Sequence, residues 1–299
     1  MLRRVSDLSV ALDLTPALVS PAGVGRYADG LRRALARRAD VQLRELTAPA
    51  GLPGTIGRGL VREALWYPLL LGRRARGAQL VHCPAPYGPR TAGLPLVLSA
   101  HDVLPLSRPE LFTRTMTAHM RHVSVRHLRK ADRVVCGSSH VRGQLAELAG
   151  IDPGRVSVTP YGVDESFRPV PSEHAAPYVL CVGTLEPRKN LASALRAFHR
   201  AAPPEVRLVV VGGPGWKNEE FERELGAGGD RVTLAGRVSH DELVRLYSGA
   251  ACFLFPTLAE GFGFPVLEAM ACGAPVITSN VTSLPEVAGN AALLVDPAD

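Results

Sequence analysis

Short apolar runs bounded by Gly and Pro alternate with longer amphipathic stretches along this chain. The apolar runs are typical of buried strands, and the amphipathic stretches are typical of helices with one face in a core. Strands are predicted at 8–14, 41–46, 79–83, 95–101, 132–137, 155–160, 178–182, 207–211, 231–234, 252–255 and 276–278. Helices are predicted up to residue 38, and at 59–71, 111–131, 139–149, 190–201, 239–248 and 265–272. Strands that alternate with helices predict an α/β fold with parallel sheets.

A Pro-rich, aperiodic segment at 166–176 interrupts this alternation and is typical of a linker. The chain has 299 residues, which is enough for two domains of ordinary size. We therefore predict an N-terminal domain at 1–168 and a C-terminal domain at 169–299.

The stretch from 252 to 280 predicts a strand, a glycine-rich turn, a helix and a second strand. Pro265 is expected at the first helical position, and Gly273 is expected to end the helix. Glu260 then lies on the turn and Glu268 on the helix. Carboxylates pair well with vicinal hydroxyls, so the two predict a site for a sugar or ribose over a helix N-terminus. The alternative is that Glu268 only complements the helix dipole.

Three further places combine a strand end with polar or glycine residues. Gly23 and Gly25 follow the first strand and precede a helix, an arrangement that can cradle a phosphate, although a simple tight turn is the alternative. His101 ends a buried strand, where ligands of parallel sheets bind. Arg188 and Lys189 lie between a strand and a helix, where they could neutralise a pyrophosphate or form only a charged surface. By contrast, Ser283 and Glu286 fit a structural capping box.

Charge is distributed unevenly along the chain. Residues 1–170 carry 24 Lys and Arg against 13 Asp and Glu, whereas residues 171–299 carry 10 against 15. The basic first half suggests an anionic partner. Nucleic acid is not expected, because no binding motif accompanies the charge. The helix at 111–131 could contact an anionic membrane surface with its arginines, or simply have its apolar side in the core and its arginines in solvent.

Cysteine usage and hydropathy indicate in which cellular compartment the protein is expected. The five cysteines are far apart in apolar contexts, with no C-x-x-C pair, so they predict buried thiols in a reducing compartment. The N-terminus lacks the apolar segment of a signal peptide, and no apolar run is long enough to span a membrane. We expect a cytoplasmic protein, with a peripheral location at the inner face of the membrane as the extension of that expectation.

The string E-G-F-G-F-P-V-L-E-A-M-A-C-G-A-P-V-I, from Glu260 onward, resembles the signature of glycosyltransferase family 4, in particular its mannosyltransferase-like branch. The resemblance covers nearly the whole chain. It implies the GT-B fold, with two Rossmann-like domains facing across a cleft, an acceptor-side N-terminal domain and a nucleotide-sugar-binding C-terminal domain. Relatives usually continue into helices beyond the last residue of this chain, so the second domain is expected to be C-terminally shortened.

The resemblance also implies a retaining transfer of a hexose, with mannose from GDP-mannose as the expected donor and a glycan or lipid-linked acceptor. His101 and Glu260 are implied to orient the hexose, and Glu268 to hold the ribose. The implied donor-binding residues are Gly23, Gly25, Arg188, Lys189, Arg237, Val238, Gly261, Phe262, Gly263, Phe264 and Glu268. No metal and no other cofactor are expected. Many relatives have Arg directly after the glycine at 183, where this chain has Thr184.

Two alternatives stay open at this point. An epimerase of the same fold would release nucleotide without an acceptor, and a truncated, non-catalytic protein would bind a sugar nucleotide without turnover. A nicotinamide dehydrogenase fits poorly, because no G-x-G-x-x-G follows a predicted strand.

Overall fold

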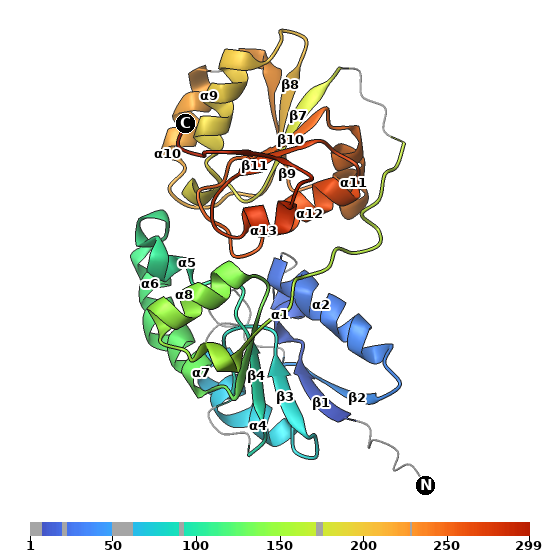
Figure 1. Ribbon diagram of the computed structural model, residues 1–299, viewed down its shortest axis with the longest axis vertical. Helices are drawn as coiled ribbons and strands as arrows, with labels where there is room; N and C mark the ends of the chain where they lie inside the picture. Colours follow the sequence, from blue (N-terminus) through green and yellow to red (C-terminus); the bar gives the residue numbers. More distant parts are fainter. Residues whose placement is uncertain (1–7, 20–22, 50–61, 90–92, 172–175, 228) are drawn as a thin grey trace. The chain divides into compact units, whose positions relative to one another are not determined.

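The computed structural model describes residues 8–19, 23–49, 62–89, 93–171, 176–227 and 229–299. These residues form two compact units (Figure 1). The first unit runs to Ser107 and continues from Arg114 to Pro160; the second takes in Arg108–Thr113 and Tyr161–Asp299. Our boundary between 168 and 169 stays a prediction, as do the roles assigned to the two domains.

The first unit is built on a parallel sheet of six strands among its described residues, in the order β2-β1-β3-β4-β5-β6. The strands are β1 (Leu8–Asp13), β2 (Val41–Leu46), β3 (Leu80–Cys83), β4 (Leu96–Ser99), β5 (Arg133–Cys136) and β6 (Val156–Val158). Its helices are α1 (Thr15–Val19), α2 (Gly23–Ala36), a π-helical segment (Arg62–Leu70), α4 (Leu71–Arg74), α5 (Leu104–Ser107), α6 (Arg114–His119), a second π-helical segment (Met120–Ser124), α7 (Val125–Lys130) and α8 (Ser139–Ala149). Short 3-10 turns precede α6 (Pro109–Leu111, in the second unit) and β6 (Pro153–Arg155).

The second unit has a parallel sheet of six strands in its described part, in the order β12-β11-β10-β7-β8-β9. The strands are β7 (Tyr178–Val182), β8 (Arg207–Val211), β9 (Val232–Gly236), β10 (Cys252–Phe255), β11 (Val276–Ser279) and β12 (Leu293–Val295). The helices are α9 (Leu191–Ala201), α10 (Glu219–Ala227), α11 (His240–Gly249), α12 (Phe264–Ala271) and α13 (Leu284–Ala288), with 3-10 turns at Pro187–Lys189 and Gly229–Arg231.

Hydrophobic side chains cover both faces of the second sheet, as a parallel sheet requires. One cluster packs Tyr247 of α11 and Val266 of α12 against Phe253. Another packs Leu195 of α9 and Phe221 of α10 against Leu208. These Rossmann-like units confirm the predicted α/β class. Neighbouring strands in each sheet are not always consecutive in sequence, because parallel strands are joined by crossover connections.

The first core contains residues from two of the predicted helices. Trp66 and Tyr67 are 2% and 3% exposed, so the predicted apolar helix around them belongs to the core. Val125 and Leu128 of α7 are also buried in this cluster, while Arg126 and Arg129 are exposed. The last part of the predicted helix at 111–131 thus has apolar residues in the core and arginines outside, whereas Met116 of α6 is 37% exposed. The helix begins at residue 114 rather than 111. The membrane contact suggested for this segment stays a prediction.

Some elements of the structure differ from those predicted from the sequence. Gly23 and Gly25 are not in a loop; they belong to the first turn of α2, which begins at Gly23. The first residues of the helix predicted at 59–71 fall outside the described residues. The elements α1, α10 and β12 were not predicted; β12 is short and α10 carries few apolar residues, so neither shows a clear periodicity.

Candidate donor-binding site

Two loops of the second unit follow neighbouring parallel strands, β7 and β10. The carboxyl ends of adjacent parallel strands lie at one edge of a sheet, so the loops that follow Val182 and Phe255 meet there. The first loop carries Arg188 and Lys189, and the second carries Glu260. The Arg188 carbonyl accepts hydrogen bonds from the Leu258 N–H at 2.8 Å and from the Thr257 hydroxyl at 2.7 Å, which joins the two loops.

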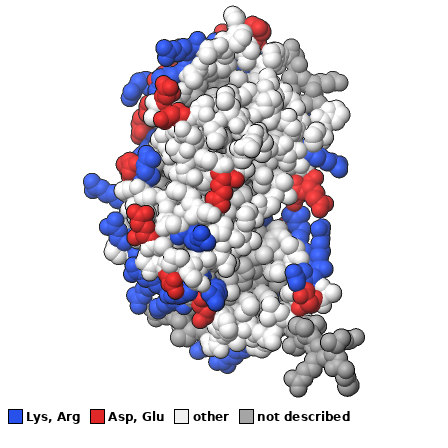
Figure 2. Space-filling view, viewed as in Figure 1, with Lys and Arg blue, Asp and Glu red and all other residues white. Residues whose placement is uncertain are grey.

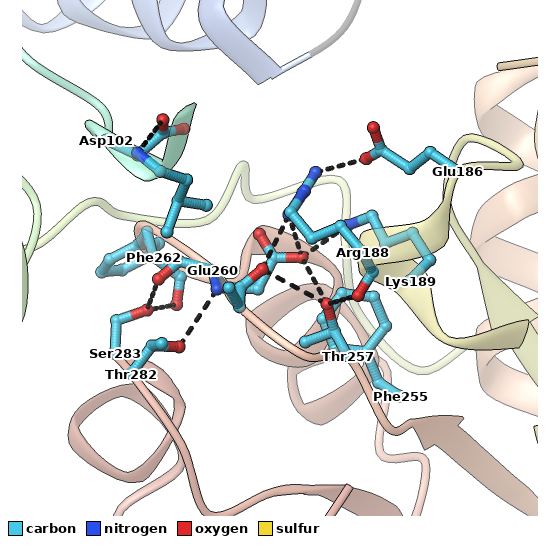
Figure 3. A network of polar contacts seen from close by, with 12 residues as sticks. Asp102, Glu186, Arg188, Lys189, Phe255, Thr257, Glu260, Phe262, Thr282 and Ser283 are labelled. Carbon is cyan, nitrogen blue, oxygen red and sulfur yellow. Dashed lines mark hydrogen bonds and ion pairs between the residues drawn. The ribbon is translucent and has the colours of Figure 1, made fainter. Parts of the chain in front are cut away.

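Four charged side chains meet between these loops (Figure 3). Arg188 Nη1 and Lys189 Nζ both lie 2.6 Å from Glu260 Oε1. Arg188 Nη2 lies 2.5 Å from Glu186 Oε1. Arg188 and Lys189, which are adjacent in sequence, thus both point a nitrogen at the same oxygen of Glu260. The structure brings together Arg188, Lys189 and Glu260, which were chosen from separate motifs.

This network is buried, which strengthens its electrostatics. Burial raises the pKa of Glu260, but the charges and hydrogen bonds of Arg188 and Lys189 outweigh it and hold that pKa below the ordinary value. Burial and the neighbouring Arg188 charge lower the pKa of Lys189, against the opposing pull of Glu260. The Lys189 ammonium also lies 4.6 Å from the centre of the Phe255 ring, a cation–π contact. Both cations are therefore held in place before any ligand arrives.

A second glycine turn supports the loop that carries the cations. It comprises residues 212–215, after β8. A Cβ added at Gly212 would overlap the Gly183 carbonyl oxygen, and one at Gly215 would overlap the Leu185 carbonyl oxygen. Gly213 accepts a hydrogen bond from the Leu185 N–H at 3.0 Å. Only glycines allow this close approach of two backbones, so this turn fixes the start of the 183–190 loop.

Arg237 lies over the same turn. A Cβ added at Gly213 would be 2.6 Å from Arg237 Nε, so the guanidinium stem covers this glycine. The adjacent Val238 packs on the core cluster between the sheet and α11. The donor-binding role implied for Arg237 and Val238 stays a prediction.

The loop that carries Glu260, at 256–263 between β10 and α12, is called the glutamate loop here. Its conformation is held by an unusual backbone angle and by two hydroxyl groups. Gly263 has φ +107° and forms the N-cap of α12, a conformation that favours glycine. The Ser283 hydroxyl lies 3.0 Å from the Glu260 carbonyl and 2.9 Å from the Phe262 carbonyl, to which it donates. The Thr282 hydroxyl accepts from the Glu260 N–H at 3.0 Å, although its own φ of +58° is rare for a β-branched residue.

These contacts correct the predicted capping box. Ser283 is the N-cap of α13, but its side chain makes no capping hydrogen bond, because its hydroxyl is turned toward the glutamate loop (Figure 3). Loops that bind ligands are commonly held by such side chain–backbone bonds. Ser283 is therefore a supporting residue of the site.

We expect Ser283→Ala to weaken the site more than the fold. Removing the hydroxyl leaves buried carbonyls of the loop without their donor, which costs about 1–3 kcal/mol. The expected result is a several-fold higher KM for the nucleotide sugar and a moderately lower free energy of unfolding, measured by urea denaturation. Ser193→Ala is the control and should be nearly neutral, because the half-buried Ser193 of α9 accepts a hydrogen bond from the exposed Arg196 at 2.8 Å. An unchanged KM would contradict the supporting role.

Glu268 lies deeper than Glu260. It is the fifth residue of α12, beyond the first helical turn, so the alternative that it complements the helix dipole there is wrong. Its side chain is 2% exposed, and the Tyr247 hydroxyl donates to Oε2 at 3.2 Å. Pro265 is the second residue of the helix rather than the first, and Gly273 follows its end with φ +80°. The ribose-binding role of Glu268 stays a prediction.

Aromatic rings lie around the glycine-rich turn at 261–264 that leads into α12. Tyr161 stacks on Phe264 at 5.3 Å with an interplanar angle of 10°, and lies 4.8 Å from Phe262. Gly261, Phe262 and Gly263 are buried, whereas Phe264 is half-buried. The first N–H groups of α12 have no partner within the helix. The predicted contact of this turn with a diphosphate is compatible with that arrangement and stays a prediction.

His101 lies in the first unit, two residues after β4. Its Nε2 is 3.1 Å from the Pro84 carbonyl, which can only accept, so Nε2 carries the proton. Burial lowers the pKa of His101, which favours the neutral ring. Tyr27 of α2 lies edge-on to it, 4.9 Å between ring centres. The roles predicted for His101, Gly23 and Gly25 toward a hexose or diphosphate stay predictions.

His82 gives the first unit a pH-dependent stability. It lies 3.0 Å from the Ser99 hydroxyl, and burial, with a smaller contribution from His101, lowers its pKa to about 4. In the unfolded chain His82 takes up a proton near pH 6.5, whereas in the folded protein it does so only near pH 4. The free energy of unfolding therefore falls as the pH drops from 6.5 toward 4. The loss is roughly 3 kcal/mol at most.

We expect His82→Gln to reduce this pH dependence, as measured by urea unfolding at pH 7 and pH 5. His122→Gln, on the exposed surface, is the control and should leave the slope unchanged. An identical slope for wild type and His82→Gln would contradict the assignment.

Reasoning from the sequence did not select Glu186, Thr257 and Thr282 for the site. Glu186 stands two residues before Arg188, a spacing that could have pointed to an ion pair. The hydroxyls of Thr257 and Thr282 gave no such signal, because their partners are backbone groups far away in sequence.

No group of three or more His, Cys, Asp or Glu side chains suited to a metal ion occurs in the described ranges. The described helices are all too short or too polar to span a bilayer. The five cysteines are free, and all except the half-buried Cys252 are buried, as predicted.

Comparison with known proteins places this arrangement in a family. The model of glycosyltransferase family 4 matches residues 21–167, and that of glycosyl transferases group 1 matches residues 163–299. The chain belongs to glycosyltransferase family 4 and has its GT-B fold of two Rossmann-like units. The predicted resemblance is thereby confirmed.

Individual relatives agree with this assignment. The chain is 32% identical to O-antigen chain mannosyltransferase B of Escherichia coli over 220 residues, 68% of this chain and 58% of that protein. The matched part covers 58% of that protein and 52% of D-inositol 3-phosphate glycosyltransferase of Acidothermus cellulolyticus, so the chain spans little more than half the length of these two relatives. Sucrose-phosphate synthase of Thermosynechococcus elongatus superposes with a TM-score of 0.75 at 21% identity, over 98% of this chain and 86% of that one. HepE of Anabaena, in complex with UDP-glucose, gives 0.71 at 18% identity, with the same coverage.

Proposed function

We propose that this protein is a retaining glycosyltransferase that moves a hexose from a nucleotide sugar to a glycan or lipid-linked acceptor. The observation that carries the proposal is the convergence of Arg188 Nη1 and Lys189 Nζ on one oxygen of Glu260. Two fixed cations aimed at one oxygen atom suit the diphosphate of a sugar nucleotide. The Glu260 carboxylate occupies the position proposed for that anion.

The chemical step follows from this charge arrangement. As the glycosidic bond to the diphosphate breaks, negative charge grows on the leaving phosphate. Preorganised donors at a growing charge are commonly the largest catalytic contribution, about 3–4 kcal/mol for each donor removed. Arg188 and Lys189 would stabilise the leaving group, and Glu260, once displaced from them, would orient hydroxyls of the hexose. His101 keeps its predicted role toward the hexose as a separate proposal. Glu268 would hold the ribose. No metal would be required, because the two cations supply the charge.

Mannose from GDP-mannose is the proposed donor. The support is the identity to a mannosyltransferase that acts on an O-antigen chain. UDP-sugars are the competing donors, because the structurally similar HepE was solved with UDP-glucose.

The proposed location is cytoplasmic, with peripheral contact to an anionic membrane. Exposed Arg121, Arg126, Arg129 and Lys130 lie on the helical segment from 120 to 130. Figure 2 shows Lys and Arg side chains gathered along the side of the first unit that carries α6 and α7, among a few acidic ones. Flotation with vesicles of anionic lipid should retain the protein, whereas neutral vesicles should not; equal behaviour would reject the membrane contact.

The test of the function combines donor screening with an acceptor assay. GDP- and UDP-sugars are first compared by the thermal stabilisation that they confer. Labelled donor is then incubated with and without glycan or lipid-linked acceptors, in the presence and absence of EDTA. Transfer that needs an acceptor and survives EDTA supports the proposal. Nucleotide release without acceptor would indicate an epimerase, and binding without turnover a non-catalytic sugar-nucleotide binder.

A further inference from the structure

Glu186 is a buried carboxylate whose position needs an explanation. Its side chain is 3% exposed, and it precedes the 3-10 turn Pro187–Lys189 in an extended conformation. It makes no capping hydrogen bond to that turn. A carboxylate is costly to bury without a partner, so its pairing with Arg188 accounts for its place.

The two carboxylates hold different nitrogens of the same guanidinium. Glu186 Oε1 accepts from Arg188 Nη2 at 2.5 Å, while Glu260 Oε1 lies 2.6 Å from Nη1. Because the guanidinium is planar, fixing Nη2 also sets the direction of Nη1. Arg188 Nη1 additionally donates to the Ala259 carbonyl at 3.1 Å. Glu186 therefore acts on the far side of Arg188 from the point where the cations converge.

The net charge of the network suggests that a bound diphosphate would replace one of the two carboxylates and leave the other in place. The two cations and two carboxylates of this network sum to zero charge. A diphosphate that takes the place of the Glu260 carboxylate leaves the Glu186 pair intact. Arg188, which has a long flexible side chain, then keeps one partner throughout the binding of the donor.

We propose that Glu186 is a positioning residue: it holds the Arg188 fork so that Nη1 faces the donor diphosphate, and thereby sets donor affinity without touching the donor. This inference rests on the proposed function. It runs against simple electrostatics, since a nearby negative charge by itself weakens the binding of an anion. The two effects have opposite signs, so they can be distinguished by experiment.

The experiment measures the affinity for GDP and UDP by calorimetry, and KM and kcat with the donor that the screen selects. We expect Glu186→Ala to weaken nucleotide binding and raise KM about tenfold. Glu186→Gln should recover most of this loss, because its amide oxygen still accepts from Nη2. In an Arg188→Ala background, Glu186→Ala should cause no further loss, since the residue has nothing left to position.

Glu220→Ala is the matched control, because Glu220 pairs with Arg196 on the exposed surface of the same unit, at 2.9 Å. It should leave nucleotide affinity unchanged. Unchanged or tighter binding by Glu186→Ala, or a loss that adds to that of Arg188→Ala, would overturn the inference. Should Glu186→Ala not fold, Glu186→Gln decides: binding tighter than wild type overturns it, and binding within a few-fold weaker supports it.

The variants also separate this inference from the proposed function. If Arg188→Ala and Lys189→Ala lose nucleotide binding while Glu186→Ala does not, only the positioning role fails. If Arg188→Ala and Lys189→Ala both bind nucleotide normally, the proposed function itself fails.

Discussion

Lys189→Ala is expected to reduce turnover roughly a hundredfold. The ammonium at 2.6 Å from Glu260 Oε1 is one of two cations at the proposed diphosphate position, and losing such a donor costs about 3 kcal/mol in the transition state. Steady-state kinetics with the selected nucleotide sugar would measure the loss. Both kcat and kcat/KM should fall, because the contact strengthens as charge develops on the leaving phosphate.

A folding control is needed for this variant, since Lys189 is also part of a buried ion pair. Removing one partner of such a pair can cost about 3–5 kcal/mol of stability. Arg188 remains beside Glu260 and limits that cost. Thermal unfolding would establish that the variant is folded at the assay temperature. Arg200→Ala, at the exposed end of α9 in the same unit, is the matched control. A folded Lys189→Ala variant with near-normal turnover would reject the role.

Gly212→Ala is expected to have the largest effect on stability. Its Cβ would overlap the backbone carbonyl of Gly183, which cannot move as a flexible side chain could. The hydrogen bond from the Gly212 N–H to the Gly236 carbonyl, at 2.8 Å, fixes the turn from its other side. We expect a loss of about 4 kcal/mol or more, in the range that marks a severe structural clash.

Urea unfolding of the purified protein would measure this loss, and nucleotide affinity should fall with it, because the turn supports the loop with Arg188 and Lys189. Gly226→Ala is the matched control: it lies in α10 of the same unit, and an added Cβ there meets nothing within 4 Å. It should be neutral or slightly stabilising, by up to about 1 kcal/mol. Equal stabilities for the two alanine variants would contradict the packing argument.

Much of the second unit could be predicted from the sequence, because local patterns specify it. The apolar runs at 178–182, 207–211 and 252–255 match β7, β8 and β10 in full, since each is buried on both faces and bounded by Gly, Pro or charged residues. The start of α8 was equally local: Ser138 caps it by accepting from the Val141 N–H at 3.2 Å.

Predictions failed where a local motif had a stronger distant partner. Ser283 fits a capping box, yet its hydroxyl serves the carbonyls of Glu260 and Phe262, more than twenty residues earlier. Gly23 and Gly25 read as a loop by composition, but α2 already includes them. Propensity and motif rules count neighbours along the chain and omit such contacts.

The sequence by itself determined the α/β class, the two-part organisation and the choice of Arg188, Lys189 and Glu260, because strand periodicity and motif spacing are properties of the chain. Only the tertiary structure decided that these three charges converge on one oxygen, with Glu186 holding the guanidinium from its other nitrogen. The reason is that β7 and β10 are neighbours in the sheet although some seventy residues separate them, and no local pattern carries that adjacency.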